Sequence, residues 1–301
     1  MLGHRVAERY PRTPPGWTVV SRRAVGPFTT RVEYLKPDGS AAEWSSRWHR
    51  KHASLLSRTG DGRGSIWWSP HRASWWIGVL FAIGSTCFLL GPLPGFIQLV
   101  GSAADGTVFF VGSLFFTSAA LLQYLEAANA DPGAGGERRS RMRLLTFEPH
   151  RIDWWSTLIQ LVGTLFFNVN TFRAMQQSFD TSDVDRLVWR PEAIGSVCFL
   201  ISGVLAYLEI RDGGLLAAKR TLEWKISVVN LGGCILFGIS AVAGYIVPET
   251  GDVLDLAAAN GSTCLGALCF LVGSLLLLRE TAEPSAPRPS PAATGIATRR
   301  G

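Results

Sequence analysis

The chain has 301 residues, of which 47% are hydrophobic and only 17% are charged, below the roughly 25% charged residues of an average soluble protein. The hydrophobic residues form long blocks after residue 74, whereas charge is concentrated before residue 73 and in short gaps. This distribution excludes a disordered chain and an ordinary soluble enzyme, and it predicts a protein that spans a membrane several times.

The first segment, residues 1–66, is polar and basic. Two strand-like runs at 29–35 and 41–48 flank a Lys-Pro-Asp-Gly turn signal, so we expect a small β-hairpin here. The stretch 47–52 carries three Lys or Arg residues and two His residues. We expect it to lie beside the membrane and to contact anionic lipid headgroups, in preference to metal binding by its histidines.

Hydrophobic segments follow, each with the roughly 17–25 residues that a helix needs to cross a hydrocarbon core about 30 Å thick. They are apolar throughout rather than alternating, which indicates helices and not barrel strands. The six segments are 74–91, 106–125, 152–172, 192–209, 223–247 and 255–278. We therefore predict an all-α integral membrane protein with a six-helix membrane domain at 67–280 and a disordered tail at 281–301. We expect Phe96–Val100 to lie along the membrane interface.

The positive charges indicate how these helices are oriented. Of the 29 Lys and Arg residues, 26 lie in the N-terminal segment, in the tail or in the gaps that follow the second and fourth segments. These regions share one side of the membrane, and the positive-inside rule makes that side cytoplasmic. Both termini are thus expected in the cytoplasm, with the protein in the cell membrane. The same sorting explains the net charge of +6, so no nucleic-acid partner is expected.

A basic pair followed by tryptophan recurs at the start of the first, third and fifth segments. The copies are His71-Arg72-Ala73-Ser74-Trp75-Trp76, His150-Arg151-Ile152-Asp153-Trp154-Trp155 and Lys219-Arg220-Thr221-Leu222-Glu223-Trp224. Eight residues after the last tryptophan of each copy is a glycine, at Gly84, Gly163 and Gly232. We interpret the last tryptophans, Trp76, Trp155 and Trp224, as anchors at the membrane interface.

The second, fourth and sixth segments share another pattern: a glycine, a phenylalanine four residues later, small residues at +7 and +8, and a glutamate at +14. The glycines are Gly112, Gly195 and Gly266, and the glutamates are Glu126, Glu209 and Glu280. Agreement at so many offsets predicts three helical hairpins, at about 70–126, 149–210 and 219–280, derived from one two-helix unit. In both patterns the glycines are predicted to let helix backbones pack closely in lipid.

The repeated charges lie at the helix ends where the helix dipole disfavours them. Glu126, Glu209 and Glu280 lie at helix C-termini, where an anion is disfavoured. Arg72, Arg151 and Arg220 lie at helix N-termini, where a cation is disfavoured. Mutual pairing would remove both penalties, so we predict a collar in which arginines and glutamates of neighbouring hairpins meet at the cytoplasmic face.

Polar residues inside the spans are few, and Gln160 and Asn230 are the candidates for a solute path between hairpins. Sequence signatures of hydrolases, zinc proteases and nucleotide-binding enzymes are lacking, so we expect no catalytic residues, no cofactor and no metal. A membrane-face acid/base site at His71 and His150 is a third alternative. The five cysteines all lie in apolar stretches and are expected to be buried thiols.

The repeated hairpin, with its basic-Trp entry and the closing Tyr124-Leu125-Glu126 and Tyr207-Leu208-Glu209, resembles the YrhK-like two-helix membrane domain. The resemblance covers about residues 70–280 in three copies and implies a membrane protein without an assigned activity. The first functional hypothesis is therefore a non-enzymatic protein with a structural, lipid-interacting or sensing role. The alternative is a channel or transporter for a small solute, which a hydrated cavity reaching the middle of the membrane would favour.

Overall fold

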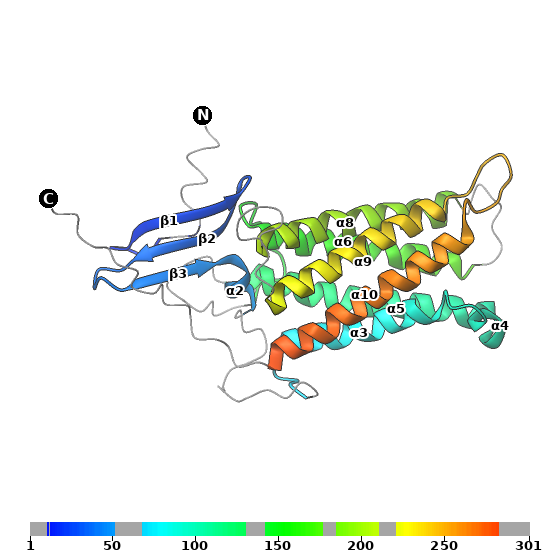
Figure 1. Cartoon of the computed structure of the whole chain (residues 1–301), viewed down its shortest axis with the longest axis horizontal. Helices are drawn as coiled ribbons and strands as arrows, with labels where there is room; N and C mark the ends of the chain where they lie inside the picture. The colour runs from blue at the N-terminus through cyan, green and yellow to red at the C-terminus, as the bar shows by residue number, and fades with distance from the viewer. Residues whose placement is uncertain are drawn as a thin grey trace.

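The computed structural model describes residue 11 and residues 13–51, 68–130, 142–176, 185–210 and 221–282. In this part of the chain, a small β-sheet lies at one end of a bundle of long helices (Figure 1). Part of the basic stretch 47–52 and the predicted tail from residue 283 onward lie outside the described residues. Thr281 and Ala282, which were assigned to the tail, instead complete the last helix.

The sheet is an antiparallel meander of β1 (Thr18–Val25), β2 (Phe28–Leu35) and β3 (Ala41–Ser45). β2 covers the first run with strand-like sequence, whereas β3 covers the second only as far as Ser45, and residues 46–48 of that run are helical. β1 adds a third strand that the sequence pattern did not reveal, because its side chains are mostly exposed and lack a clear apolar alternation. Val32, Tyr34, Ala42 and Trp44 form the buried core of the sheet. A short helix, α2 (Ser46–Lys51), follows β3 directly.

The long helices coincide with the hydrophobic segments to within a few residues. They are α3 (Ala73–Leu90), α5 (Ser102–Asn129), α6 (Ile152–Ala174), α8 (Arg190–Ile210), α9 (Leu222–Ala243) and α10 (Leu256–Ala282). A five-residue helix, α4 (Phe96–Val100), follows α3, and a π-helical turn, η1 (Asp185–Trp189), precedes α8. α9 ends four residues earlier than expected, at Ala243 with Gly244 as its C-cap, after which Ile246 and Val253 form an isolated β-bridge.

Five of the described helices are long and apolar enough to cross a membrane, namely α3, α5, α8 with part of η1, α9 and α10. α6 has 23 residues but is not among them. Its sequence includes Asp153, Gln160, Asn168 and Asn170, which lower its mean hydropathy.

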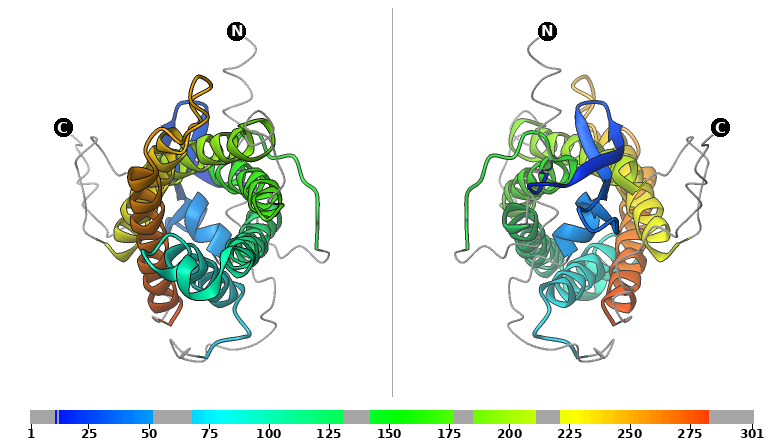
Figure 2. Two further views of the ribbon diagram at one scale, coloured as in Figure 1. Left: turned by 90° about the vertical axis from the view of Figure 1, so that its right-hand side faces the viewer. Right: turned by 90° about the vertical axis from the view of Figure 1, so that its left-hand side faces the viewer.

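The six long helices are arranged as a closed ring (Figure 2). Each packs against the next in chain order, and α10 packs back against α3. At this closing contact a Cβ on Gly78 would lie 2.7 Å from Leu278 Cδ2, so the two helices are close there. α3, α6 and α9 begin at the end of the ring that holds the sheet, which we call the sheet end; α4 lies at the opposite, far end (Figure 1).

The two helices of each hairpin cross at a pair of glycines. A Cβ on Gly84 would lie 2.6 Å from Phe116 Cδ2 and 2.9 Å from Gly112 O. The same arrangement recurs at Gly163 with Gly195 and at Gly233 with Gly266. The glycine prediction therefore needs one correction, Gly233 in place of Gly232. A Cβ on Gly232 would have only Cys269 Sγ near it, at 4.0 Å, because one residue rotates a helical position by about 100°.

Four residues after each crossing glycine is a buried phenylalanine that points into the ring. These six residues, the phenylalanine layer, are Phe88, Phe116, Phe167, Phe199, Phe237 and Phe270. The centroids of neighbouring phenylalanine side-chain rings lie between 4.9 Å (Phe167–Phe199) and 6.5 Å (Phe88–Phe167) apart. The axis of the helix ring is thus filled by aromatic side chains near the middle of the bundle.

Candidate functional site

A cavity of about 130 Å³ lies inside the ring on the sheet-end side of the phenylalanine layer. Every long helix contributes to its lining, and α2 contributes two arginines. Phe116, Phe199 and Phe270 line its inner end, toward the middle of the bundle. This volume corresponds to about four water molecules at the roughly 30 Å³ that each occupies in the liquid.

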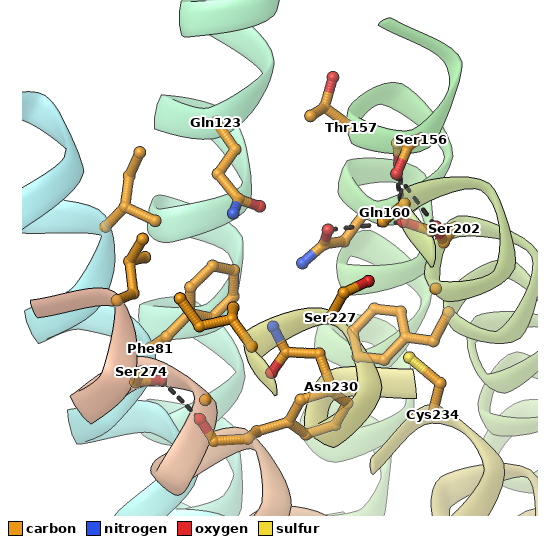
Figure 3. Close-up of a pocket in the computed structure, with 18 of the residues that line it drawn as sticks. Phe81, Gln123, Ser156, Thr157, Gln160, Ser202, Ser227, Asn230, Cys234 and Ser274 are labelled. Carbon is orange, nitrogen blue, oxygen red and sulfur yellow. Dashed lines mark hydrogen bonds between the residues drawn. The ribbon is translucent and has the colours of Figure 1, made fainter. Parts of the chain in front are cut away.

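Amide and hydroxyl side chains project into the cavity from different helices. Gln123 comes from α5, Gln160 from α6, and Ser227 and Asn230 from α9, and all four lie around the same space (Figure 3). Gln160 and Asn230, the residues predicted to mark a solute path, are therefore brought together. Asn230 is accommodated by a glycine, because a Cβ on Gly273 would collide with its carboxamide.

Some of these polar groups are fixed by hydrogen bonds. Ser156 Oγ donates to Ser202 O at 3.0 Å, and Ser202 Oγ lies 2.8 Å from Ser156 O, which ties α6 to α8. Ser202 Oγ also lies 3.5 Å from Gln160 Oε1 (Figure 3). The two serine bonds hold Ser202 beside the Gln160 side chain.

Other polar atoms of the cavity are buried without a hydrogen bond. Within the described residues, Gln123 Oε1 and Ser227 Oγ have no hydrogen-bond partner, and Ser227 is only 5% exposed. Leaving a buried polar atom unpaired costs about 1–3 kcal/mol. Such atoms lining a cavity indicate that water or a polar solute occupies it.

The sheet end of the cavity is covered by α2. Arg47 Nη2 lies 3.7 Å from Glu280 Oε1, and Arg47 Nε lies 3.5 Å from Glu223 Oε1. Arg50 Nη2 lies 3.6 Å from Glu209 Oε2. Viewed along the bundle, α2 lies at the centre of the ring (Figure 2). The two arginines predicted to contact lipid therefore face the acidic residues of the bundle.

Two arginines of the predicted collar donate hydrogen bonds to backbone carbonyls at the sheet end. Arg72 Nη1 donates to Thr281 O, and Arg151 Nη1 donates to Ala127 O at 2.8 Å. Each arginine thus caps the carbonyl next to a repeated glutamate, at the end of the preceding hairpin. Arg151 also forms a buried ion pair with Asp153. Arg220 lies outside the described residues.

The repeated tryptophans have a shared local geometry in the first two hairpins. Trp76 Nε1 donates to Pro70 O at 3.0 Å, and Trp155 Nε1 donates to Pro149 O at 3.1 Å. Trp76 is 38% exposed, and Trp155 and Trp224 are partly buried. Exposed aromatic edges at the sheet end fit the anchoring role proposed for them.

Arg47, Arg50, Gln123 and Ser227 line this site although the sequence did not predict them for it. The two arginines are three residues apart and so share one face of a helix, but a lipid-facing helix would show the same spacing. Among the residues that the structure describes, no group of three or more His, Cys, Asp or Glu side chains could hold a metal ion. His71 and His150 are not among the residues lining the cavity.

Comparison of the chain with protein-family models, with curated proteins and with solved structures finds no match. The site is therefore interpreted from its geometry, and the relationship to the YrhK-like domain stays a prediction.

Proposed function

We propose that this protein is a non-enzymatic channel or transporter whose central cavity binds a small polar solute on a gated path through the helix ring. The observation that carries this proposal is the cavity itself. It is enclosed by all six long helices, reaches the phenylalanine layer and is lined by Gln123, Gln160, Ser227 and Asn230. The solute would enter from the sheet end when α2 moves and would pass the layer when its aromatic side chains rearrange.

We further propose six crossings, with both termini on the cytoplasmic side of the cell membrane. Two observations support this. α6 occupies a full position in the ring between α5 and α8, although it is the most polar of the long helices. The distribution of Lys and Arg assigns the sheet end to the cytoplasm. The recurring glycine crossings support descent of the three hairpins from one unit, as in a YrhK-like family.

A purely structural or lipid-interacting role is supported less well. Such a role would be served by a bundle with an apolar, filled interior. The described side chains around the cavity instead include polar atoms without a hydrogen-bond partner. Such atoms destabilise the fold unless they bind water or a solute. The bilayer remains the partner that we propose for the outer surface of the ring.

The proposal is tested by solute entry into liposomes that contain the purified full-length protein. We expect a variant with its gate weakened, Arg47→Gln/Arg50→Gln, to admit at least one of three small probes: urea, guanidinium or formate. Adding Gly273→Leu should abolish entry, because the new side chain would displace Asn230 and fill the cavity. Gly261→Leu is the control on the same helix, since a Cβ there meets nothing within 4 Å. If no probe enters faster than into empty liposomes, the proposed function is wrong.

A further inference from the structure

We propose, resting on the function proposed above, that the solute is a small monovalent cation. We also propose that α2 is a tethered plug whose two guanidinium groups occupy the place where that cation enters. The proposal starts from a set of carboxylates at the mouth of the cavity, which we call the carboxylate ring: Glu126, Glu209 and Glu280.

The carboxylate ring is built by the repeat. Each member lies fourteen residues after a crossing glycine, near the end of α5, α8 or α10. Glu126 is 5% exposed and Glu209 is 8% exposed. Helix C-termini disfavour anions and burial removes their hydration, so these carboxylates need cations beside them.

Two such cations come from outside the hairpins. Arg50 approaches Glu209, and Arg47 approaches Glu280 and Glu223, at the distances given above. Burial alone would lower the pKa of Arg50, but Glu209, Asp153 and Glu126 outweigh it and raise that pKa above its usual value. The nitrogen–oxygen distances of 3.5–3.7 Å exceed the roughly 2.7–2.9 Å of a direct charge-assisted hydrogen bond. These three ion pairs thus lack the short hydrogen bonds that would fix the two arginines in place.

Without the plug, the mouth would be strongly negative. The carboxylate ring and Glu223 would lose the guanidinium groups of Arg47 and Arg50. Of the described arginines at this end of the repeated motifs, Arg151 is paired with Asp153 and Arg72 donates to Thr281 O. Rings of acidic side chains select cations and exclude anions at the entrances of channels.

The cavity behind the mouth suits the same class of solute, and this observation is independent of the acidic residues. Ser227 is buried, lacks a hydrogen-bond partner in the described part of the chain and turns its oxygen to the cavity, as Gln123 turns Oε1 (Figure 3). The rings of Phe116, Phe199 and Phe270 line the inner end, and aromatic rings attract cations. Beyond the two plug arginines, no cationic side chain is among the described residues that line the cavity.

The plug is joined rigidly to the sheet. α2 begins at the residue after β3 ends, and the ring of His49 in α2 stacks on Trp44 in β3 with 5.5 Å between centroids. His49 Nδ1 also lies 2.8 Å from Ser45 O. A movement of the sheet would therefore carry both arginines out of the mouth together.

Guanidinium and urea test this proposal, because they are nearly the same size and shape and differ in charge. In liposomes with the full-length protein, Arg47→Gln/Arg50→Gln should admit guanidinium about tenfold faster than the wild type does, and faster than urea. Neutralising the carboxylate ring in the same variant, with Glu126→Gln, Glu209→Gln and Glu280→Gln, should remove the preference for guanidinium. Arg31→Gln is the matched control, because Arg31 pairs with Glu43 within the sheet at 2.8 Å.

The outcomes separate the two proposals. Entry of urea or formate at least as fast as guanidinium would overturn the cation assignment while leaving a solute path in place. Equal guanidinium entry in the wild type and in Arg47→Gln/Arg50→Gln would overturn the plug. No entry of any probe in any variant would overturn the proposed function as well. If the double variant aggregates, Arg50→Gln alone, which keeps Arg47 on Glu280, should give a smaller increase with the same preference for guanidinium.

Discussion

At the scale of single residues, the absence of a side chain decides where helices meet. Gly233 and Gly266 place the backbones of α9 and α10 so close that a Cβ on Gly233 would lie 3.1 Å from Gly266 O. The same Cβ would lie 3.0 Å from the ring of Phe270. Helices in lipid gain little from hiding apolar surface, so these close backbone contacts supply much of their attraction. Each crossing glycine also makes room for the phenylalanine of its partner helix.

The neighbouring glycines of α9 provide a direct test of this role. Gly233→Ala should destabilise the protein by about 1–3 kcal/mol, because the added methyl group overpacks the crossing. Gly232→Ala should have little effect, since its Cβ would meet only Cys269 Sγ at 4.0 Å. Thermal unfolding in detergent measures both. Equal losses of melting temperature would show that the crossing is not where the structure places it.

At the scale of helices, arginines join neighbouring hairpins at the sheet end. Arg151, at the start of α6, reaches the end of α5 at Ala127, and Arg72, at the start of α3, reaches the end of α10 at Thr281. The unsatisfied carbonyls at a helix C-terminus are good acceptors for such cations. These two hydrogen bonds therefore connect α6 to α5 and α3 to α10 at the sheet end.

Removal of Arg151 should be costly because its partner is also buried. Arg151 is 1% exposed and Asp153 is fully buried, so Arg151→Leu leaves a carboxylate without its cation, at a cost of about 3–5 kcal/mol. The double variant Arg151→Leu/Asp153→Leu should recover part of the lost melting temperature. Arg279→Leu, at an exposed position of α10, is the control. A double variant no more stable than Arg151→Leu would contradict this account.

At the scale of the whole molecule, the ring requires α6 to run the same length of the bundle as its neighbours. We expect cysteines introduced at Gln176 and Glu249, both exposed near the far end, to react with a membrane-impermeant thiol reagent in intact cells. A cysteine at Arg143, in the segment that precedes the start of α6, should react only in inverted vesicles. The natural cysteines are first replaced. Labelling of positions 143 and 176 from the same side would show that α6 does not cross the membrane and would overturn the six-span proposal.

Much of the helical layout was predictable because it depends on local patterns. Hydrophobic length predicted each long helix to within a few residues, and the +4 spacing predicted the phenylalanines of α5, α8 and α10. The register of the third hairpin was one residue wrong, since the Trp224 motif was used for alignment and the crossing depends on Gly233. Gln160 and Asn230 line the same cavity, as expected for polar residues that turn away from lipid, and the solute path through it stays a prediction.

The sequence by itself determined the helices, the repeated glycines and the positions of the glutamates along their helices, because each of these depends on spacing within one segment. Only the tertiary structure decided that α10 closes on α3, that the phenylalanine layer fills the axis, and that Arg47 and Arg50 cover the cavity. These features join residues as far apart as Arg47 and Glu280. The charges of a basic helix beside a membrane can pair with lipid headgroups or with acidic side chains of the protein. Only the position of the sheet over the helix ring decides that Arg47 and Arg50 pair with the protein.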